Sequence, residues 1–323
     1  MGITRRQFVQ GLALTAAGAP LVSLAAYPDR PVTIVVPLAA GGVTDIVARY
    51  VANQLGSVWT SPIVVENRPG AGGGVGAEHV AKARPDGYTL IMGTVSSHAI
   101  NASLYENLRY DNIRDFDPVS LVASGPNLLV VHPSVPVSTL GELIAYLKAN
   151  PGRLSYGSAG IGTSTHVLAE LFKMKTGTEM THVPYKGSSA MMTDLIAGRV
   201  QLAFDNMPTA LAQVRAGTLK PIAVSSAERW ADEPKIPTLS ETIPGFVATS
   251  WQGLFAPAGA PPQTLDALSA EVQKILKSPA AIARFRDLGT NAAGMPRAEF
   301  AEFVRGETQR WAEVVKASGA KAG

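Results

Sequence analysis

The chain has 323 residues, 46% of them hydrophobic and 16% charged, which is enough apolar sequence to build two α/β lobes and excludes a disordered chain. The formal net charge is only +3, and two of the 28 basic residues lie in an N-terminal segment, so nothing in the charge favours binding to nucleic acid or to an anionic membrane. The absence of cysteine excludes disulfides, zinc–thiolate sites, cysteine nucleophiles and a lipoprotein anchor.

The first 25 residues are typical of an export signal. Arg5 and Arg6 precede an apolar stretch, Gly11–Ala26, that is too short and too interrupted for a membrane-spanning helix. The segment TRRQFV resembles the twin-arginine type of signal, and general secretion is the alternative route. We expect cleavage near Ala25, a periplasmic mature protein and no later segment that spans a membrane.

The mature chain begins with alternating strand and helix patterns. Val32–Pro37 is apolar and rich in β-branched residues, which predicts a buried strand, and Thr44–Leu55 carries apolar residues at helical spacing. The next segments are predicted as strand, helix and strand in turn: Pro62–Val65, Gly74–Ala83 and Tyr88–Met92. This βαβαβ order predicts a parallel sheet covered by helices.

An irregular stretch, Asn101–Pro118, separates this unit from a second one. Two apolar runs follow, Val119–Ala123 and Leu128–Val131, with a break predicted between them at Ser124-Gly125-Pro126. Alternation then restarts, with helices predicted over 140–149, 163–175, 189–197 and 209–216 and strands over 154–156, 180–183, 200–204 and 220–224. Residues 231–247 are loop-like, residues 250–256 are strand-like, and the tail is helical over 262–276, 279–288 and 297–317.

This order of elements predicts a two-lobed α/β protein with one discontinuous lobe. The chain leaves the first lobe near Ser124, builds the second and returns near Ser250. We expect lobe I to contain residues 26–124 plus 252–323 and lobe II to contain residues 125–251. Two crossing segments form a hinge in such an arrangement, and the cleft between the lobes is a common place for a small ligand.

A loop between the first predicted strand and helix is suited to an anion. In its sequence, PLAAGGVTD, Gly41 and Gly42 leave backbone N–H groups uncovered, and Thr44 can cap the helix that follows. A helix N-terminus attracts an anion through its unpaired N–H groups and its dipole. The alternative is a plain turn in which glycine serves the geometry alone.

A second loop of this kind, YGSAGIGTSTH, spans residues 156–166 of the second unit. Thr163, Ser164 and Thr165 place hydroxyls and amides at a helix start, where they suit a carboxylate through charge-assisted hydrogen bonds. The alternative is a run of capping residues without a ligand. One such loop in each lobe predicts a ligand with two acidic ends.

A third glycine-rich loop, RPGAGGGVGA, is close to a dinucleotide fingerprint. Its context does not fit, because Glu66-Asn67-Arg68-Pro69 separates the strand from the glycines and the next strand lacks the acidic residue that binds ribose. We expect no nucleotide there.

Other polar residues at predicted strand ends are further candidates for ligand contact. Ser97 and His98 follow the third strand. Asp205 and Asn206 end a later strand and could orient a polar group of a ligand, where a strand-end cap is the alternative. The five histidines are dispersed, and no metal spacing, carboxylate pair or nucleophile motif emerges. We therefore expect no metal, no cofactor and no catalytic set, and the rival to a binding protein is an enzyme whose residues assemble only in three dimensions.

Several motifs occur in one order along nearly all of the mature chain: YPDRPVTIVVPLAAGGVTDIVAR (27–49), VENRPGAGGGVGAEHVAKARPDGYTL (65–90), NASLYENLRYDNIRDFDPVSLVA (101–123), YGSAGIGTSTHVLAELF (156–172), HVPYKGSSAMMTDLIAGRV (182–200), FDNMPTAL (204–211) and SWQGLFAPAGAP (250–261). Together they resemble the Bug, or TctC-like, receptors of tripartite tricarboxylate transporters. The resemblance implies a periplasmic type II binding fold, the Venus flytrap, whose two lobes close over a ligand.

The resemblance also implies the ligand class and the site. Members bind small carboxylates, such as di- and tricarboxylates, acidic amino acids and aromatic acids. The loops that match 38–45 and 160–166 are implied to hold ligand carboxylates, and they include Leu38, Gly41, Gly42, Thr44, Asp45, Gly160, Thr163, Ser164 and Thr165. The segments that match Ser97-His98 and Asp205 are implied to border the same cleft. Leu38 stands where an aromatic residue is frequent, a departure that bears on pocket size.

These expectations describe a monomeric receptor that delivers its ligand to the membrane permease subunits of such a transporter. A carboxylate sensor that signals to a membrane partner is one alternative, and a periplasmic hydrolase or isomerase on the same fold is another. Because neither loop contains arginine or lysine, backbone amides and hydroxyls must meet the charge of the ligand.

Overall fold

The structure is a computed structural model that describes residues 27–322. The predicted export signal and its cleavage site near Ala25 lie outside these residues. Within them, no helix has the length and apolar character needed to cross a membrane.

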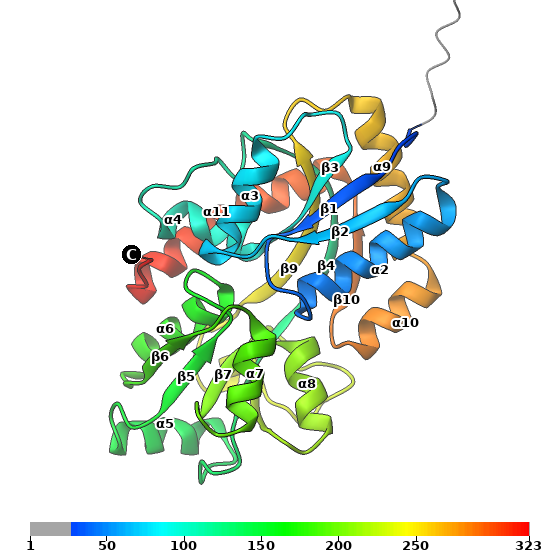
Figure 1. Cartoon of the computed structure of the whole chain (residues 1–323). Helices are drawn as coiled ribbons and strands as arrows, with labels where there is room; N and C mark the ends of the chain where they lie inside the picture. The colour runs from blue at the N-terminus through cyan, green and yellow to red at the C-terminus, as the bar shows by residue number, and fades with distance from the viewer. Residues whose placement is uncertain (1–26, 323) are drawn as a thin grey trace, which may run out of the picture.

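Two lobes share one curled, mixed sheet of ten strands (Figure 1). The path runs β2-β1-β3-β9-β4-β7-β5-β6, and β8 and β10 also pair with β4. The first lobe contains β1 (Val32–Val36), β2 (Ile63–Asn67), β3 (Thr89–Thr94), β9 (Thr249–Pro257), β10 (Asn291–Met295) and the start of β4 (Phe116–Val131). The second lobe contains the end of β4 together with β5 (Ser155–Ser158), β6 (Thr181–Pro184), β7 (Leu202–Asn206) and β8 (Lys220–Val224).

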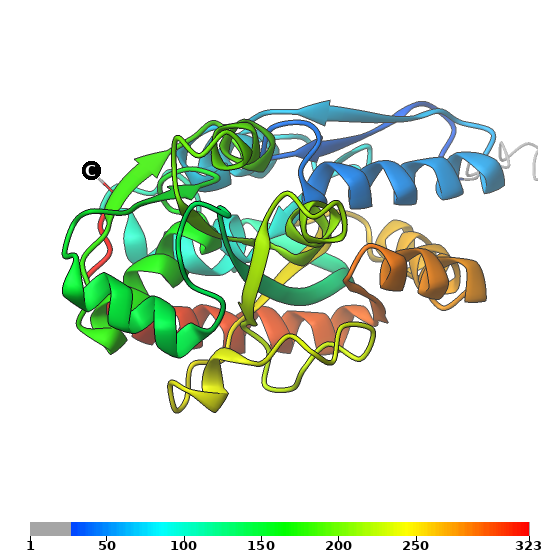
Figure 2. The ribbon, with the colours of Figure 1, turned by 90° about the horizontal axis from the view of Figure 1, so that it is seen from below.

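Helices cover both faces of the sheet in each lobe (Figures 1 and 2). In the first lobe, one face carries α2 (Val43–Val58), α9 (Pro262–Leu276) and α10 (Pro279–Asp287), and the other carries α3 (Gly74–Ala81), the π-helical turn η2 (Ser96–Ile100), α4 (Asn101–Leu104) and α11 (Arg297–Ser318). In the second lobe, α5 (Leu140–Ala149) and α6 (Ser164–Thr176) lie opposite α7 (Ser188–Ile196) and α8 (Met207–Arg215). Two short 3₁₀ turns, η1 (Ala71–Gly73) and η3 (Leu239–Glu241), lie in the connections.

The apolar strands of the first lobe follow from this layering. Along β1, Ile34 packs in the core under α2 while Val35 packs in the core under α3 and α11, because successive side chains of a strand point to opposite faces. A parallel strand covered on both faces therefore needs a continuous apolar run. Full burial of each such side chain contributes about 1.5–3 kcal/mol.

One long strand, β4, replaces the break that the sequence predicted at Ser124-Gly125-Pro126. Gly125 pairs with Ser250 and Pro126 pairs with Thr249, so the two segments that cross between the lobes lie side by side. Beyond this point β4 pairs with β7 instead of β9, and the missing N–H of proline costs little where a strand exchanges partners. The predicted break was wrong because tertiary pairing outweighs the local turn signal.

Two further differences concern elements with weak local patterns. The stretch predicted as irregular, Asn101–Pro118, begins with α4 and ends in the first residues of β4. Strand β10 was not predicted, because its NAAGM sequence lacks β-branched and aromatic residues, and antiparallel pairing with β4 defines this strand. The C-terminal helix α11 packs against η2 in the first lobe and α6 in the second, so it bridges the lobes on one side.

Candidate functional site

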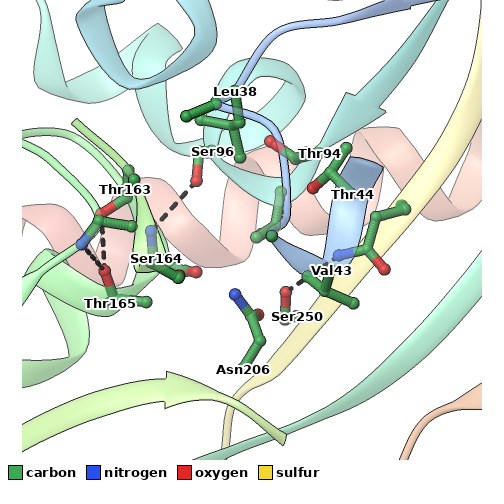
Figure 3. Close-up of a pocket in the computed structure, with 17 residues that line it drawn as sticks. Leu38, Val43, Thr44, Thr94, Ser96, Thr163, Ser164, Thr165, Asn206 and Ser250 are labelled. Carbon is green, nitrogen blue, oxygen red and sulfur yellow. Dashed lines mark hydrogen bonds between the residues drawn. The ribbon is translucent and has the colours of Figure 1, made fainter. Parts of the chain in front are cut away.

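A small pocket lies between the two lobes, where strands of both lobes end (Figure 3). Its volume is about 30 Å³, which leaves room for about two water molecules. The lining residues are Leu38, Ala39, Gly42, Val43, Thr44, Thr94, Val95, Ser96, Ala159, Thr163, Ser164, Thr165, Gly187, Ser188, Asn206, Ser250 and Gln252. None of these lining residues is charged.

Several helices point their N-termini at this pocket. The residues that immediately precede α2, α6, α7 and α8 are Gly42, Thr163, Gly187 and Asn206, and each of them lines the pocket. Gly42 and Gly187 have no side chain that could cap a helix, and the side chains of Thr163 and Asn206 accept no capping hydrogen bond. In contrast, α5, away from the pocket, begins with a complete capping box. N–H groups of a first helical turn have no intrahelical partner and form the positive end of the helix dipole. The pocket therefore has the geometry of an anion site.

Sheet topology explains why these helices converge. Helix α2 follows β1, α6 follows β5, α7 follows β6 and α8 follows β7, and within each lobe these strands run parallel. The carboxyl ends of parallel strands lie at one edge of a sheet, so the helices that follow them begin there. Strand β3 ends at the same edge, and its last residue, Thr94, is followed in the pocket by Val95 and Ser96.

Hydroxyl groups form the second-lobe wall of the pocket. The Thr163 hydroxyl donates to the carbonyl oxygen of Gly160 at 2.7 Å, and its Oγ1 lies 2.8 Å from Oγ1 of Thr165. The backbone N–H of Ser164 donates to Oγ of Ser96 at 3.1 Å, so this bond joins the two lobes across the pocket (Figure 3). The first helical turn of α6 therefore bonds directly to a hydroxyl of the first lobe.

The pocket brings together part of the residue set proposed from the sequence. From the first loop it includes Leu38, Gly42 and Thr44, and from the second loop it includes the hydroxyl run Thr163, Ser164 and Thr165. The remaining candidates are Gly41, Asp45, Ser97, His98, Gly160 and Asp205, and none of these lines the pocket.

Gly41 and Asp45 shape the first loop from within. The N–H of Gly41 is not directed at the pocket but donates to Oδ2 of Asp45 at 3.0 Å. Asp45 also accepts from Arg49 and Asn67 at 3.0 Å each. Burial alone would raise the pKa of Asp45, but these hydrogen bonds lower it below its usual value. The carboxylate therefore holds the loop that positions Gly42.

Ser97 and His98 lie in the core behind the pocket. Both are fully buried, and the His98 ring stacks on Phe255 at 4.1 Å between ring centroids. Oγ of Ser97 lies 2.9 Å from Nδ1 of His98, while Nε2 of His98 has no hydrogen-bond partner. Burial lowers the pKa of His98 to about 3, so the ring is neutral at ordinary pH.

Gly160 and Asp205 lie close to the pocket without lining it. Gly160 lines a larger neighbouring cavity at the mouth of the cleft. Asp205 is fully buried behind the pocket, where it accepts hydrogen bonds from the Ser188 hydroxyl at 2.7 Å and from the Thr209 hydroxyl. Burial raises the pKa of Asp205. Asp205 orients Ser188, which does line the pocket.

Most of the contribution from α7, α8 and β9 was not predicted from the sequence. Asn206 was considered together with Asp205 at a predicted strand end, but Gly187, Ser188, Ser250 and Gln252 were not proposed as site residues. A usable signal existed for two of them, because Gly187-Ser188 stands between a predicted strand and a predicted helix, like the two loops that were proposed. The side chain of Asn206 faces the pocket (Figure 3), and its Oδ1 is buried without a hydrogen-bond partner.

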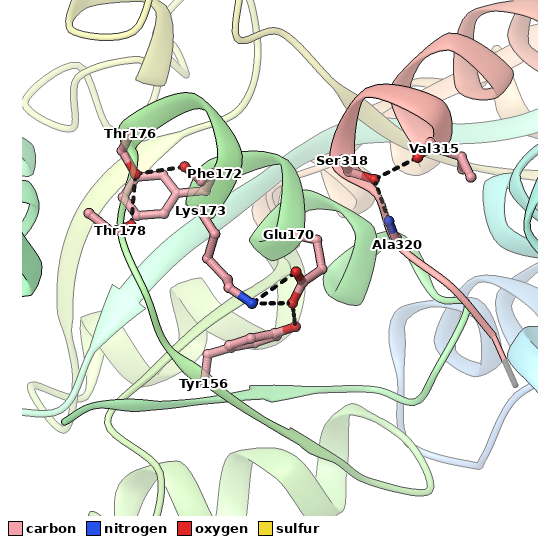
Figure 4. A network of polar contacts seen from close by, with 9 residues as sticks. All are labelled: Tyr156, Glu170, Phe172, Lys173, Thr176, Thr178, Val315, Ser318 and Ala320. Carbon is pink, nitrogen blue, oxygen red and sulfur yellow. Dashed lines mark hydrogen bonds and ion pairs between the residues drawn. The ribbon is translucent and has the colours of Figure 1, made fainter. Parts of the chain in front are cut away.

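No reactive pair of side chains lies in the pocket. Oγ of Ser158 is 2.7 Å from Nε2 of His182, but neither residue lines the pocket, and burial lowers the pKa of His182 to about 4. Nearby, Tyr156 and Lys173 both donate hydrogen bonds to Glu170 in a polar network inside the second lobe (Figure 4). In the described part of the chain, no group of three or more His, Cys, Asp or Glu side chains is placed to hold a metal.

Comparison with known proteins places the chain in a family. Residues 47–320 match the model of TctC, the tripartite tricarboxylate transporter family receptor. The chain is also 37% identical over 324 residues to protein BugT of Bordetella pertussis, an alignment that covers 99% of each chain. The chain belongs to this receptor family.

Solved structures of TctC-type receptors have the same fold as this chain. R. palustris Rpa4515 with adipate has a TM-score of 0.89 and 39% identity and covers 91% of this chain and 99% of its own. MatC from Rhodopseudomonas palustris, with bound malate, has a TM-score of 0.85 and 34% identity and covers 90% of this chain and 100% of its own. The periplasmic binding protein BugD has a TM-score of 0.86 and 34% identity, with coverage of 91% and 99%. The fold is therefore the two-lobed fold of periplasmic binding proteins.

Proposed function

We propose that this TctC-family receptor captures a small organic acid in the interlobe pocket and delivers it to the permease subunits of a tripartite tricarboxylate transporter. The observation that carries the proposal is the convergence of four helix N-termini on a pocket whose lining has no charged side chain. Such a site favours a carboxylate over a neutral or cationic ligand. The receptors with bound adipate and malate support this ligand class.

Recognition rests on hydrogen bonds from neutral groups to charged oxygens. A carboxylate can accept from first-turn N–H groups of α2 and α6 and from the hydroxyls of Thr44 and Thr165, which line opposite walls of the pocket. It can also take the place of Ser96 as the acceptor for the N–H of Ser164. Hydrogen bonds to a charged partner contribute about 1.5–3 kcal/mol each. Several of them support micromolar or tighter affinity, roughly −8 kcal/mol.

Binding requires the lobes to separate and close. The pocket of about 30 Å³ is smaller than a dicarboxylate, and the bond between Ser164 and Ser96 closes it from within. A second contact between the lobes, from the Ser189 hydroxyl to the carbonyl oxygen of Ala40 at 3.4 Å, lies nearby. We propose a hinge at the paired crossing segments, with lobe I comprising residues 26–124 plus 252–323 and lobe II comprising residues 125–251.

The proposed cellular setting follows from the family and the N-terminal sequence. We propose that residues 1–25 direct export, that the signal is removed near Ala25 and that the mature protein works in the periplasm as a monomer. In this setting the protein is a receptor and not an enzyme, and the family model likewise describes a receptor.

Isothermal titration calorimetry against a panel of mono-, di- and tricarboxylates, with the matching amides as neutral controls, tests the ligand class. We expect at least one acid to bind at micromolar concentration or below and its amide to bind at least 100-fold more weakly. A folded protein that binds no acid, or binds the amides equally well, refutes the proposal.

An isosteric charge substitution tests the pocket itself. Asn206→Asp places a negative charge beside the proposed carboxylate position, so we expect the affinity for the acid to fall at least 100-fold, because like charges at close range cost several kcal/mol. Asn53→Asp, on the exposed side of α2, makes the same change in net charge and should leave the affinity within twofold. Equal affinities for the two variants would remove the pocket from the binding site.

A further inference from the structure

The small pocket between the lobes, which we call the anion pocket, has no space for the body of a ligand, and that space lies outside it. A second cavity, at the mouth of the cleft, has a volume of about 650 Å³, which falls in the range of small-molecule sites, whereas the anion pocket holds only about 30 Å³. The two cavities share Leu38, Ala39, Ala159, Thr163 and Gly187 in their walls. We call the larger one the outer cavity.

The outer cavity presents mainly apolar and aromatic surface. Its lining includes Pro69, Ala71, Tyr105, Ile161 and Tyr185. The Tyr105 hydroxyl donates to the carbonyl oxygen of Ile161 at 3.3 Å, so it bonds to the protein. Ile161 is 43% exposed, so its side chain is accessible to an apolar group in the cavity. These groups suit an alkyl chain or an aromatic ring.

One cation completes the outer cavity. Lys186 is its only charged lining residue, and within the described chain it has no acidic partner at ion-pair distance. Asp194, on the helix that follows Lys186, is already engaged, because it accepts from Tyr185 at 2.9 Å and pairs with Arg199 at 2.7 Å. Since none of the described residues forms an ion pair with Lys186, its ammonium can meet an acidic group at the outer end of a ligand.

We propose that the preferred ligand is an elongated or aromatic diacid, with one carboxylate in the anion pocket, an apolar body in the outer cavity and its second acidic group at Lys186. This inference rests on the carboxylate-binding function proposed above and narrows it. Compact acids such as succinate occupy the anion pocket only after the lobes open, and they leave the outer cavity to water. Each methylene buried against the outer walls should raise affinity by about fourfold.

Calorimetry on the intact mature protein tests the ligand class through two matched comparisons. Along the straight-chain diacids succinate, glutarate, pimelate and azelate, we expect affinity to rise at least tenfold between succinate and pimelate. In the aromatic pair, terephthalate should bind at least tenfold more tightly than benzoate, because only terephthalate carries a second acidic group. Equal affinity along both comparisons overturns the inference.

Substitution of Lys186 separates the two ends of the ligand. Lys186→Met should weaken pimelate and terephthalate about tenfold while leaving benzoate and octanoate within twofold, and Lys186→Arg should retain most of the diacid affinity. Lys148→Met, at an exposed lysine on α5, is the matched control and should change neither class. Thermal melting of each variant confirms that it is folded. An unchanged preference for diacids in Lys186→Met overturns the role of Lys186.

The two proposals fail in different ways. If short and long acids bind equally well and Asn206→Asp abolishes both, the carboxylate receptor stands and the outer cavity is not part of its site. If no acid of any length binds to folded wild-type protein, the receptor function fails and this inference fails with it.

Discussion

Replacing Gly187 with alanine should weaken ligand binding by blocking lobe closure. A Cβ atom at Gly187 would lie only 2.8 Å from Cβ of Ala39, which belongs to the first-lobe loop before α2, whereas Gly187 precedes α7 in the second lobe. The overlap exists only when the lobes are closed. Relief of such an overlap by local shifts costs about 1–3 kcal/mol, which corresponds to roughly a 5- to 150-fold loss of affinity.

A second effect of this substitution should be visible without ligand. Gly187 has φ +126° and ψ 166°, a backbone region that side chains rarely adopt, so alanine there also strains the loop in the open state. This strain, about 1–3 kcal/mol, lowers the melting temperature of the free protein. Gly177→Ala is the matched control, because Gly177 also has a positive φ, +61°, but a Cβ there meets nothing within 4 Å. We expect Gly177→Ala to lose stability and keep its affinity.

The prediction is tested by measuring ligand affinity by titration calorimetry and stability by thermal melting for four proteins: wild type, Gly187→Ala, Ala39→Gly and the double variant. Ala39→Gly removes the atom that the new Cβ would strike, so the double variant should recover most of the affinity that Gly187→Ala loses, a coupling that a double-mutant cycle measures directly. If Gly187→Ala binds ligand as tightly as wild type, or if the double variant binds no more tightly than Gly187→Ala, lobe closure does not depend on the close approach of Gly187 and Ala39.

Three further predictions concern stability. Burial holds the pKa of His98 at about 3 in the folded protein, against 6.5 in the unfolded chain, so between these pH values only the unfolded chain binds the proton. The free energy of unfolding therefore falls by up to roughly 5 kcal/mol as the pH drops through this window. In chemical denaturation at several pH values, a His98→Phe variant should lose less stability over the same window, and an identical loss would contradict the role of His98. Glu307 accepts hydrogen bonds from the indole N–H groups of Trp251 at 2.9 Å and Trp311 at 3.1 Å. Glu307→Leu leaves both buried donors unpaired and should lower the free energy of unfolding by about 2–5 kcal/mol. A loss below about 0.5 kcal/mol would show that water replaces the carboxylate. Thr139→Ala removes the capping box of α5 and should cost about 1 kcal/mol with no change in ligand affinity, and a loss of affinity would mean that α5 is coupled to the site.

Local sequence determined most of the elements and the two loops that face each other across the pocket. Apolar runs such as Val32–Pro37 and helical spacing such as Thr44–Leu55 depend on side-chain periodicity, which short-range physics sets. The hydroxyl run Thr163–Thr165 and the glycine pair at 41–42 were visible for the same reason, because glycine and hydroxyl residues at a helix start carry a local signal. The motifs in order also indicated the family.

Tertiary structure decided which of these groups line the pocket and where its remaining walls come from. Gly41 and His98 are close in sequence to residues that line the pocket. However, the N–H of Gly41 donates to Asp45, and the ring of His98 is buried against Phe255. The position of His98 depends on packing between elements far apart in the chain. The starts of α7 and α8 reach the pocket only because β5, β6 and β7 end at one edge of the sheet. Strand order and the crossing of β4 are non-local pairings, and no residue pattern of a single segment encodes them.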